Sequence, residues 1–240
     1  MTPRGRLFAL EGIDGAGTTT QARLLADGLA AQGRAVHLTC EPSRGPIGAL
    51  LRQVLGHAVR AVDRASLALL FAADRVDHLR DEVEPRLGQG VDVVSDRYVY
   101  SSLAYQSMDL APEWVAEINR LAPEADLTVY LRVDPDEAAR RRADRGSVEI
   151  FETTPEQIRI ASLYDDFFGS APGDGSWIPD PGGSGWIRQD PPGSRPLLAR
   201  VGRQPAWVVI DGAQPIDEIQ RQLRKLAREI CPRPQLWQSA

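Results

Sequence analysis

The 240-residue sequence contains only two cysteines, and its longest apolar run is seven residues. Cys40 and Cys231 lie at no metal-ligand spacing, and two thiols do not make a disulfide framework. The apolar run, residues 67–73, is far shorter than the ~20 residues that cross a bilayer. Residues 1–10 lack the apolar stretch of a signal peptide. We therefore expect a cytoplasmic protein that has no membrane partner.

An excess of positive charge is also missing, because 28 Lys and Arg residues face 33 Asp and Glu residues, a net charge of −5. Proteins that bind nucleic acid usually present a basic field, so we expect no nucleic-acid partner. Lys225 is the only lysine, which leaves 27 of the 28 cations as arginines. A site that needs a cation must therefore draw on arginine.

Hydrophobic residues make up 42% of the chain, enough for a substantial core. Short apolar clusters alternate with amphipathic stretches, and this alternation predicts parallel strands joined by right-handed helical crossovers. The expected fold is α/β, a five-stranded parallel sheet with helices on both faces. We expect strands at 6–10, 35–39, 91–95, 127–133 and 207–210, and helices at 19–32, 47–55, 64–87, 135–145, 155–168 and 216–230, with another helical region from 101 that Pro112 divides.

The pattern breaks at residues 169–205, where 8 Gly and 7 Pro make up 15 of 37 residues. Such a segment lacks the apolar surface to form a core of its own. We expect it to be a loop inserted into a single domain that spans residues 1–240. A surface loop that the fold merely tolerates and a mobile loop that closes over a ligand both fit this composition.

A glycine-rich stretch follows the first strand, Gly12-Ile13-Asp14-Gly15-Ala16-Gly17-Thr18-Thr19. Its spacing is that of the phosphate-binding P-loop, so we expect a P-loop NTPase type of fold. The residues expected to bind ATP phosphates are Gly12, Asp14, Gly15, Ala16, Gly17, Thr18, Thr19 and Thr20, with the Thr19 hydroxyl on Mg²⁺. Thr18 stands where the pattern has lysine, which removes roughly 1.5–3 kcal/mol of stabilisation unless an arginine supplies the charge.

Three further stretches complete a recognisable set: Thr39-Cys40-Glu41-Pro42, Leu70-Phe71-Ala72-Ala73-Asp74-Arg75, and Asp96-Arg97-Tyr98 with Ser101-Ser102-Leu103-Ala104-Tyr105-Gln106. In this order and spacing the chain strongly resembles the thymidylate kinase family, P-loop enzymes that transfer the γ-phosphoryl of ATP to dTMP. The resemblance runs from about residue 7 to 168 and resumes at 207. It implies ATP as phosphoryl donor, Mg²⁺ as cofactor and a homodimer.

The resemblance also implies a binding site for dTMP. Its expected members are Glu41, Phe71, Arg75, Arg97, Ser101, Tyr105 and Gln106, and Asp96 is expected near Mg²⁺ with Thr19. Phe71 suits stacking on a pyrimidine, and Arg75, one helical turn later, suits bidentate binding of a monophosphate together with Arg97. Taken alone, Phe71 fits an ordinary core position and Tyr105 fits a structural one.

The arginine-rich segment around 140–154 resembles the lid of the family. The resemblance assigns catalytic roles to Arg141 and Arg145 on this segment, beside Asp14 and Arg97 in the body of the site. The customary later arginine of the lid falls at Ile150. Two expected positive charges are therefore absent, so three hypotheses stay open: a dTMP kinase compensated by other arginines, a catalytically impaired nucleotide-binding protein, and a kinase for another (deoxy)nucleoside monophosphate.

Overall fold

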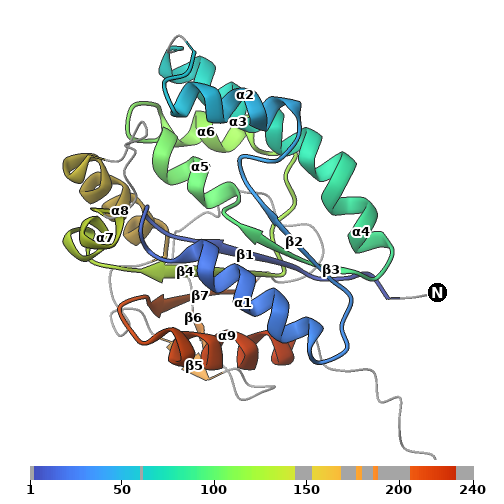
Figure 1. Cartoon of the computed structure of the whole chain (residues 1–240). Helices are drawn as coiled ribbons and strands as arrows, with labels where there is room; N and C mark the ends of the chain where they lie inside the picture. Colours follow the sequence, from blue (N-terminus) through green and yellow to red (C-terminus); the bar gives the residue numbers. More distant parts are fainter. Residues whose placement is uncertain are drawn as a thin grey trace, which may run out of the picture.

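The computed structural model describes residues 3–59, 62–143, 153–168, 177–179, 186–188 and 206–230. Its centre is a five-stranded sheet in the order β2-β3-β1-β4-β7, and every neighbouring pair is parallel (Figure 1). The strands are β1 (Leu7–Glu11), β2 (Val36–Cys40), β3 (Asp92–Asp96), β4 (Leu127–Arg132) and β7 (Ala206–Asp211). The predicted α/β fold with five parallel strands is confirmed.

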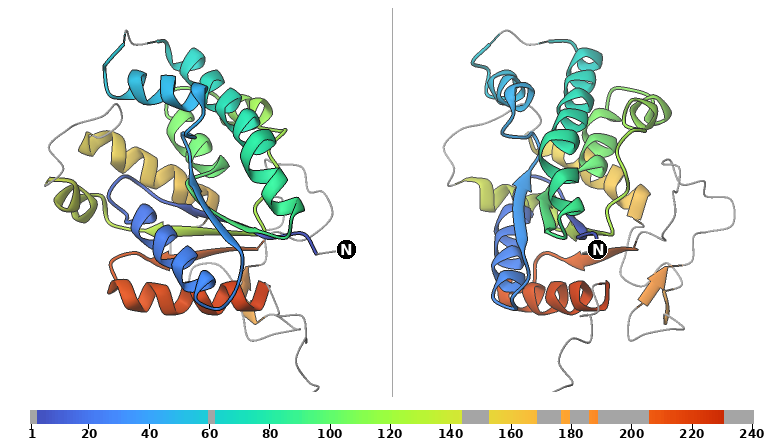
Figure 2. Two further views of the ribbon diagram at one scale, coloured as in Figure 1. Left: turned by 45° about the vertical axis from the view of Figure 1, so that its right-hand side comes forward. Right: turned by 90° about the vertical axis from the view of Figure 1, so that its right-hand side faces the viewer.

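Helices cover both faces of this sheet, as predicted. On one side lie α1 (Thr18–Ala30) and α9 (Ile216–Ile230), and on the other lie α3 (Arg64–His78), α5 (Val99–Gln106) and α8 (Thr154–Phe168), with α2 (Pro46–Leu55) and α6 (Pro112–Ile118) packed on this second layer (Figures 1 and 2). The β1 side chains alternate between the two cores because successive residues of a strand point to opposite faces. Phe8 and Leu10 belong to one core, and Leu7 and Ala9 belong to the other.

The long helix expected over 64–87 is interrupted. It is made of α3, a π-helical segment at Leu79–Val83 and α4 (Glu84–Gly88). Pro85 lies in the first turn of α4, where its missing N–H is harmless, and the wide π turn precedes it. None of the helices in the described ranges is long and apolar enough to span a membrane.

The region expected to be an inserted loop contains regular structure. Its two described pieces, β5 (Trp177–Pro179) and β6 (Trp186–Arg188), form an antiparallel pair with Ile178 opposite Ile187. Strand pairing needs only local backbone partners, which a count of glycine and proline does not reveal. The rest of this insert lies outside the described residues, as does 144–152, which covers most of the predicted lid.

An aromatic cluster fixes α8 against the edge of the sheet. Phe168 is 2% exposed, and its ring lies 5.2 Å from Tyr130 of β4, 5.6 Å from Trp207 of β7 and 4.6 Å from Tyr100 of α5. Tyr130 also stacks on Tyr164, with their ring centroids 4.9 Å apart. Because α8 carries residues of the candidate site, this cluster positions the site as well as the core.

We predict that Phe168→Ala lowers the free energy of unfolding by about 3–5 kcal/mol, because it leaves a cavity among four aromatic rings. Ile158→Ala on the same helix is the matched control, since Ile158 is 52% exposed and its truncation should cost less than about 0.5 kcal/mol. Chemical denaturation followed by fluorescence measures both. Equal costs for the two variants would contradict the assigned core.

Candidate functional site

The loop between β1 and α1 ends in an open helix N-terminus. Gly17 adopts a left-handed φ of 94°, and α1 begins at Thr18 with no side-chain cap and no acidic residue in its first turn. The first helical hydrogen bond runs from the Gln21 N–H to the Gly17 carbonyl (3.0 Å), so the amides of residues 18–20 are left out of the helical ladder. Uncapped amides at the positive end of a helix dipole bind anions.

Two of the loop amides that were expected to bind phosphate have protein partners instead. The Asp14 N–H donates to Oε1 of Gln157 (2.9 Å), and the Ala16 N–H donates to the Ile13 carbonyl (3.0 Å). The expectation that the loop binds phosphate therefore narrows to the remaining amides, those of Gly15, Gly17 and the first turn of α1.

Every polar group of Asp14 is bound by a residue from another part of the chain. Gln157 of α8 accepts from its N–H and donates Nε2–H to Oδ2 (2.8 Å). Arg97, which follows β3, forms an ion pair with Oδ1 (2.5 Å), and Arg142, the last residue of α7 (Pro135–Arg142), donates to the Asp14 carbonyl. Asp14 therefore connects the phosphate loop to the end of β3 and to the two helices that flank residues 144–152.

Helix α7 (Pro135–Arg142) lies directly against the phosphate loop. Asp134 caps its N-terminus by accepting from the amides of Asp136 (2.9 Å) and Glu137 (3.3 Å). A Cβ atom at Gly15 would collide with the carbonyl of Ala138, and Gly15 also has a left-handed φ of 92°. Only glycine fits there without strain, and its absent side chain lets the helix approach the loop.

Arg97 is held in an uncommon backbone conformation, with a φ of 71°. Its N–H donates to the Leu10 carbonyl (2.9 Å), and its own carbonyl accepts from Oγ of Ser95 (2.7 Å). Its side chain donates to the Gly12 carbonyl (2.8 Å) and covers the ring of Tyr105 at 5.2 Å. Left-handed non-glycine residues often occur at functional sites, where the surrounding structure imposes them.

One pocket beside the phosphate loop contains every residue predicted to bind the acceptor. It is lined by Asp14, Glu41, Pro42, Leu55, Phe71, Arg75, Arg97, Tyr98, Ser101, Ser102, Tyr105 and Gln106. Ser102 Oγ and Gln106 Oε1 are buried without a hydrogen-bond partner in the described part of the chain. Leaving a buried polar atom unpaired costs about 1–3 kcal/mol, so this pocket suits a ligand with polar edges.

Arg75 lies at the floor of this pocket and is 2% exposed. Its Nε donates to Oε2 of Glu41 (2.8 Å), its Nη1 to Oδ1 of Asn119, and its Nη2 to the Tyr98 carbonyl (3.1 Å). All three guanidinium nitrogens are thus bound by the protein. The expectation that Arg75 holds the acceptor phosphate bidentately together with Arg97 stays a prediction.

The two residues predicted to hold a metal lie next to each other. Thr19 Oγ1 donates to Oδ2 of Asp96 (2.5 Å), while Oδ1 of Asp96 is buried and has no described partner. The described residues contain no cluster of three or more His, Cys, Asp or Glu that could enclose a metal. One hydroxyl and one carboxylate fit Mg²⁺, which keeps several waters and takes further oxygens from phosphate.

Arg141, predicted to be catalytic, points toward the loop after β7. Its Nε donates to Glu137 (2.9 Å), and its Nη1 donates to the Gly212 carbonyl (3.1 Å). Gly212 lies near the phosphate loop, since a Cβ there would be 3.6 Å from the Ala16 carbonyl. Arg145, the second predicted lid arginine, lies outside the described residues, as does Ile150.

The sequence reading missed Glu11 and Gln157 as site residues. Glu11 ends β1 fully buried and accepts from the Tyr98 N–H (3.0 Å), Ser101 Oγ (2.5 Å) and Tyr164 OH (3.0 Å). Burial raises the pKa of Glu11, an effect that the hydrogen bond from Ser101 only partly offsets. A glutamate directly after an apolar strand is a usable sequence signal for such a position. Gln157 has no local signal, because its role depends on where α8 packs.

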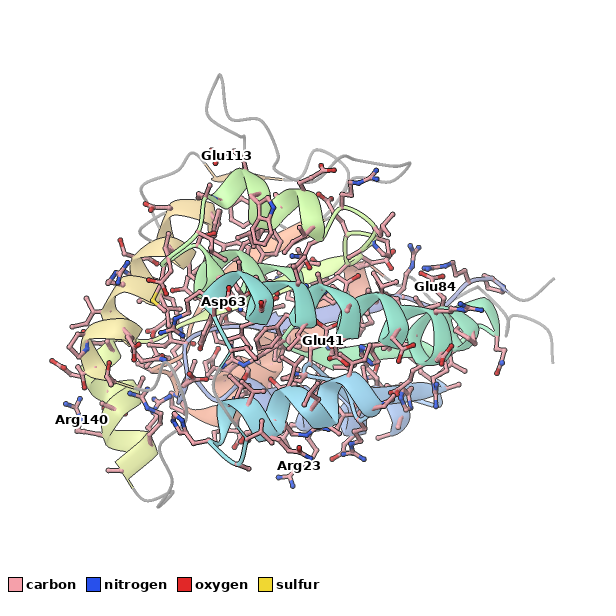
Figure 3. All side chains as sticks on the ribbon, turned by 90° about the horizontal axis from the view of Figure 1, so that it is seen from above. Arg23, Glu41, Asp63, Glu84, Glu113 and Arg140 are labelled. Atoms are coloured by element: carbon pink, nitrogen blue, oxygen red, sulfur yellow. The ribbon has the colours of Figure 1, made fainter. Side chains whose placement is uncertain are left out.

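Behind the pocket, a buried histidine joins the acidic residues of three elements. His78 of α3 lies 3.2 Å from Oε1 of Glu41, 2.8 Å from Oγ1 of Thr39 and 3.7 Å from Oε1 of Glu82. Burial alone lowers the pKa of His78, but the nearby carboxylates of Glu41, Glu82 and Asp74 outweigh it and raise the pKa overall. The folded protein therefore holds the proton on His78 more strongly than the unfolded chain does. Figure 3 labels Glu41 near the centre of the molecule, beside α3.

Comparison with known proteins identifies what the chain is similar to. A family model described as thymidylate kinase matches residues 10–171. A putative thymidylate kinase of Aeropyrum pernix is 46% identical over 162 residues, which cover 67% of this chain and 77% of the relative. Probable thymidylate kinases of Methanococcus aeolicus and Pyrococcus abyssi are 47% and 45% identical over 160 and 161 residues, with 66% and 65% of this chain covered and 77% and 78% of the relatives.

We predict that the free energy of unfolding falls as the pH rises from about 6.5 through the raised pKa of His78. Because the pKa of His78 is higher in the folded protein, protonated His78 stabilises the fold. This stabilisation is complete at pH values below the pKa of His78 in the unfolded chain, and it is lost as the imidazole of the folded protein deprotonates. His78→Gln should remove this part of the pH dependence, and His57→Gln, at an exposed position, should keep it. Denaturant unfolding at a series of pH values gives the slopes. If His78→Gln and the wild type have the same slope, the assigned network is wrong.

Proposed function

Since the chain belongs to the thymidylate kinase family, we propose that it transfers the γ-phosphoryl group of ATP to dTMP, yielding ADP and dTDP. The observation that carries the proposal is the position of the acceptor pocket. Asp14 and Arg97 belong both to the lining of that pocket and to the contacts of the phosphate loop. An acceptor phosphate at Arg97 would therefore lie beside a donor phosphate on the loop.

In this proposal the pocket recognises dTMP through separate faces of the nucleotide. Phe71 stacks on the thymine ring, and the unpaired Gln106 and Ser102 oxygens face its polar edge. Tyr105, held under Arg97, packs against the deoxyribose. Glu41 and Arg75 form the polar floor, and Ser101 accepts a 3.3 Å hydrogen bond from Arg97.

On the donor side, the amides of Gly15, Gly17 and the first turn of α1 hold the ATP phosphates, and Thr19 with Asp96 holds Mg²⁺. When bound, Mg²⁺ neutralises charge on the phosphate oxygens. Arg97 orients the acceptor phosphate, and Asp14 keeps Arg97 in place. Phosphoryl transfer needs mainly positioning and charge neutralisation, so no covalent protein intermediate is proposed. Arg141 borders the donor site at Gly212, and a catalytic role for Arg145 stays a prediction.

We also propose that the chain forms a homodimer through α3. Leu69, Ala73 and Val76 are exposed at spacings of four and three residues, so they form one apolar stripe on this helix. Leu50 on the neighbouring α2 is also exposed. A second copy of the same chain would cover this stripe symmetrically. A cytoplasmic location and the absence of nucleic-acid and membrane partners stay predictions from the sequence.

We predict that the purified full chain forms dTDP from ATP and dTMP in a chromatographic assay, and that omitting Mg²⁺ abolishes turnover. Arg97→Ala should lower kcat by about 10³-fold, the lower end of what an arginine on a transferred phosphoryl contributes. Arg120→Ala is the control, because Arg120 is an exposed residue paired only with Glu117 among the described residues.

Other outcomes of this assay separate the three hypotheses. Binding of dTMP and ATP without dTDP formation would contradict the kinase proposal and favour a nucleotide-binding protein. Faster turnover with dUMP, dCMP or dGMP would reassign the acceptor.

We predict a dimer mass by light scattering for the wild type, and a monomer for Val76→Glu, because a buried charge without a partner disrupts an apolar interface. Leu121→Glu is the matched control, since Leu121 is 66% exposed and lies outside α3. A monomeric wild type, or a Val76→Glu variant that is still dimeric, would refute this interface.

A further inference from the structure

We propose that Arg142 supplies the positive charge that the phosphate loop lacks at Thr18, by binding the donor phosphates of ATP. This inference rests on the proposed function, because it concerns the same phosphoryl donor. Thr18 is 5% exposed, and its Cγ2 lies 3.3 Å from where a Gly12 Cβ would be. The threonine methyl is thus turned into the base of the loop, and its hydroxyl carries no charge to neutralise a phosphate.

Arg142 reaches the loop because of how α7 packs. The close approach of Gly15 to Ala138 places the last turn of α7 beside the loop, and Arg142 Nη1 donates to the Asp14 carbonyl. Backbone carbonyls point outward from a phosphate-binding loop while its amides point inward. Arg142 is thus held on the carbonyl side of the peptide group whose N–H, that of Gly15, is one of the amides still available to a phosphate.

Arg142 is the one arginine of α7 that has no carboxylate partner in the described part of the chain. Arg140 and Arg141 each form an ion pair with Glu137, at 2.7 and 2.9 Å. Arg142 is half-buried, and the Asp14 carbonyl is its described acceptor. Its remaining N–H groups are therefore available to a phosphate, which guanidinium binds in a fork geometry.

Two other cations, Arg97 and Lys225, are less suited to this role. Arg97 is already neutralised by the Asp14 carboxylate and faces the acceptor pocket. Lys225 is exposed on α9, and its neighbour Arg224 packs on Gly28, ten residues along α1 from Thr18. At ~1.5 Å per residue, that contact is about 15 Å from the loop.

The test compares Arg142→Gln with Arg140→Gln in the full chain. Glutamine keeps an N–H donor for the Asp14 carbonyl but removes the charge, so it separates charge from structure. Arg140 is the matched control, because its side chain is 70% exposed and it appears at the outer edge of α7 in Figure 3. Isothermal titration with ATP and steady-state kinetics with ATP and dTMP measure both variants.

Arg142→Gln should weaken ATP binding and lower kcat/KM for ATP on the order of 10- to 100-fold, the worth of one charge-assisted hydrogen bond. The KM for dTMP should change less than about two-fold, and Arg140→Gln should match the wild type. Thr18→Lys should restore most of the lost ATP affinity in the Arg142→Gln background, because the lysine supplies the missing charge from inside the loop.

The inference is overturned if ATP affinity in Arg142→Gln equals that in Arg140→Gln, or if Thr18→Lys does not repair the loss. If Arg142→Gln does not fold, Arg142→Lys keeps the charge and should retain ATP affinity within about ten-fold; a larger loss in this folded variant also overturns it. The titration with ATP does not need turnover. A wild type that binds ATP but makes no dTDP therefore refutes the kinase proposal while Arg142 is still tested.

Discussion

The engagement of Asp14 at every polar group is the constraint on which the arrangement of the site depends. A loop of glycines has little stiffness of its own, so its shape must be imposed by contacts from outside. Here a single aspartate receives bonds from the end of β3, from α7 and from α8. Moving any one of these elements shifts the loop, and the loop in turn fixes the distance between the donor and acceptor positions.

A second buried network supports the acceptor side. Glu41 at the end of β2 binds both Arg75 and His78 of α3, and Arg75 continues to Asn119 and to the Tyr98 carbonyl. Charges this deep are costly unless they are paired and hydrogen-bonded, and these are. The network thus ties the floor of the pocket to the helix that carries Phe71, so the proposed stacking of a base would take place on a fixed surface.

The sheet, the order of the helices and the group of residues around the pocket could be predicted from the sequence. Hydrophobic periodicity and motif spacing are local patterns that indicate these features. The sequence was insufficient for side-chain roles that depend on packing. The spacing of Arg75 from Phe71 suggested a phosphate ligand, but it did not reveal that the Arg75 guanidinium binds Glu41 and Asn119. Gln157 could not be found at all, because its partner is 143 positions away along the chain.

The contact between Gly15 and Ala138 limits how such a site can change by mutation. An arginine at position 15 would bring a cation into the loop directly, but its Cβ would push α7 away and take Arg142 with it. With this backbone, an arginine at position 15 and Arg142 on α7 cannot both lie at the loop. A substitution that places a charge at position 15 would therefore remove the one that α7 brings, and the absence of a side chain at Gly15 keeps Arg142 beside the loop.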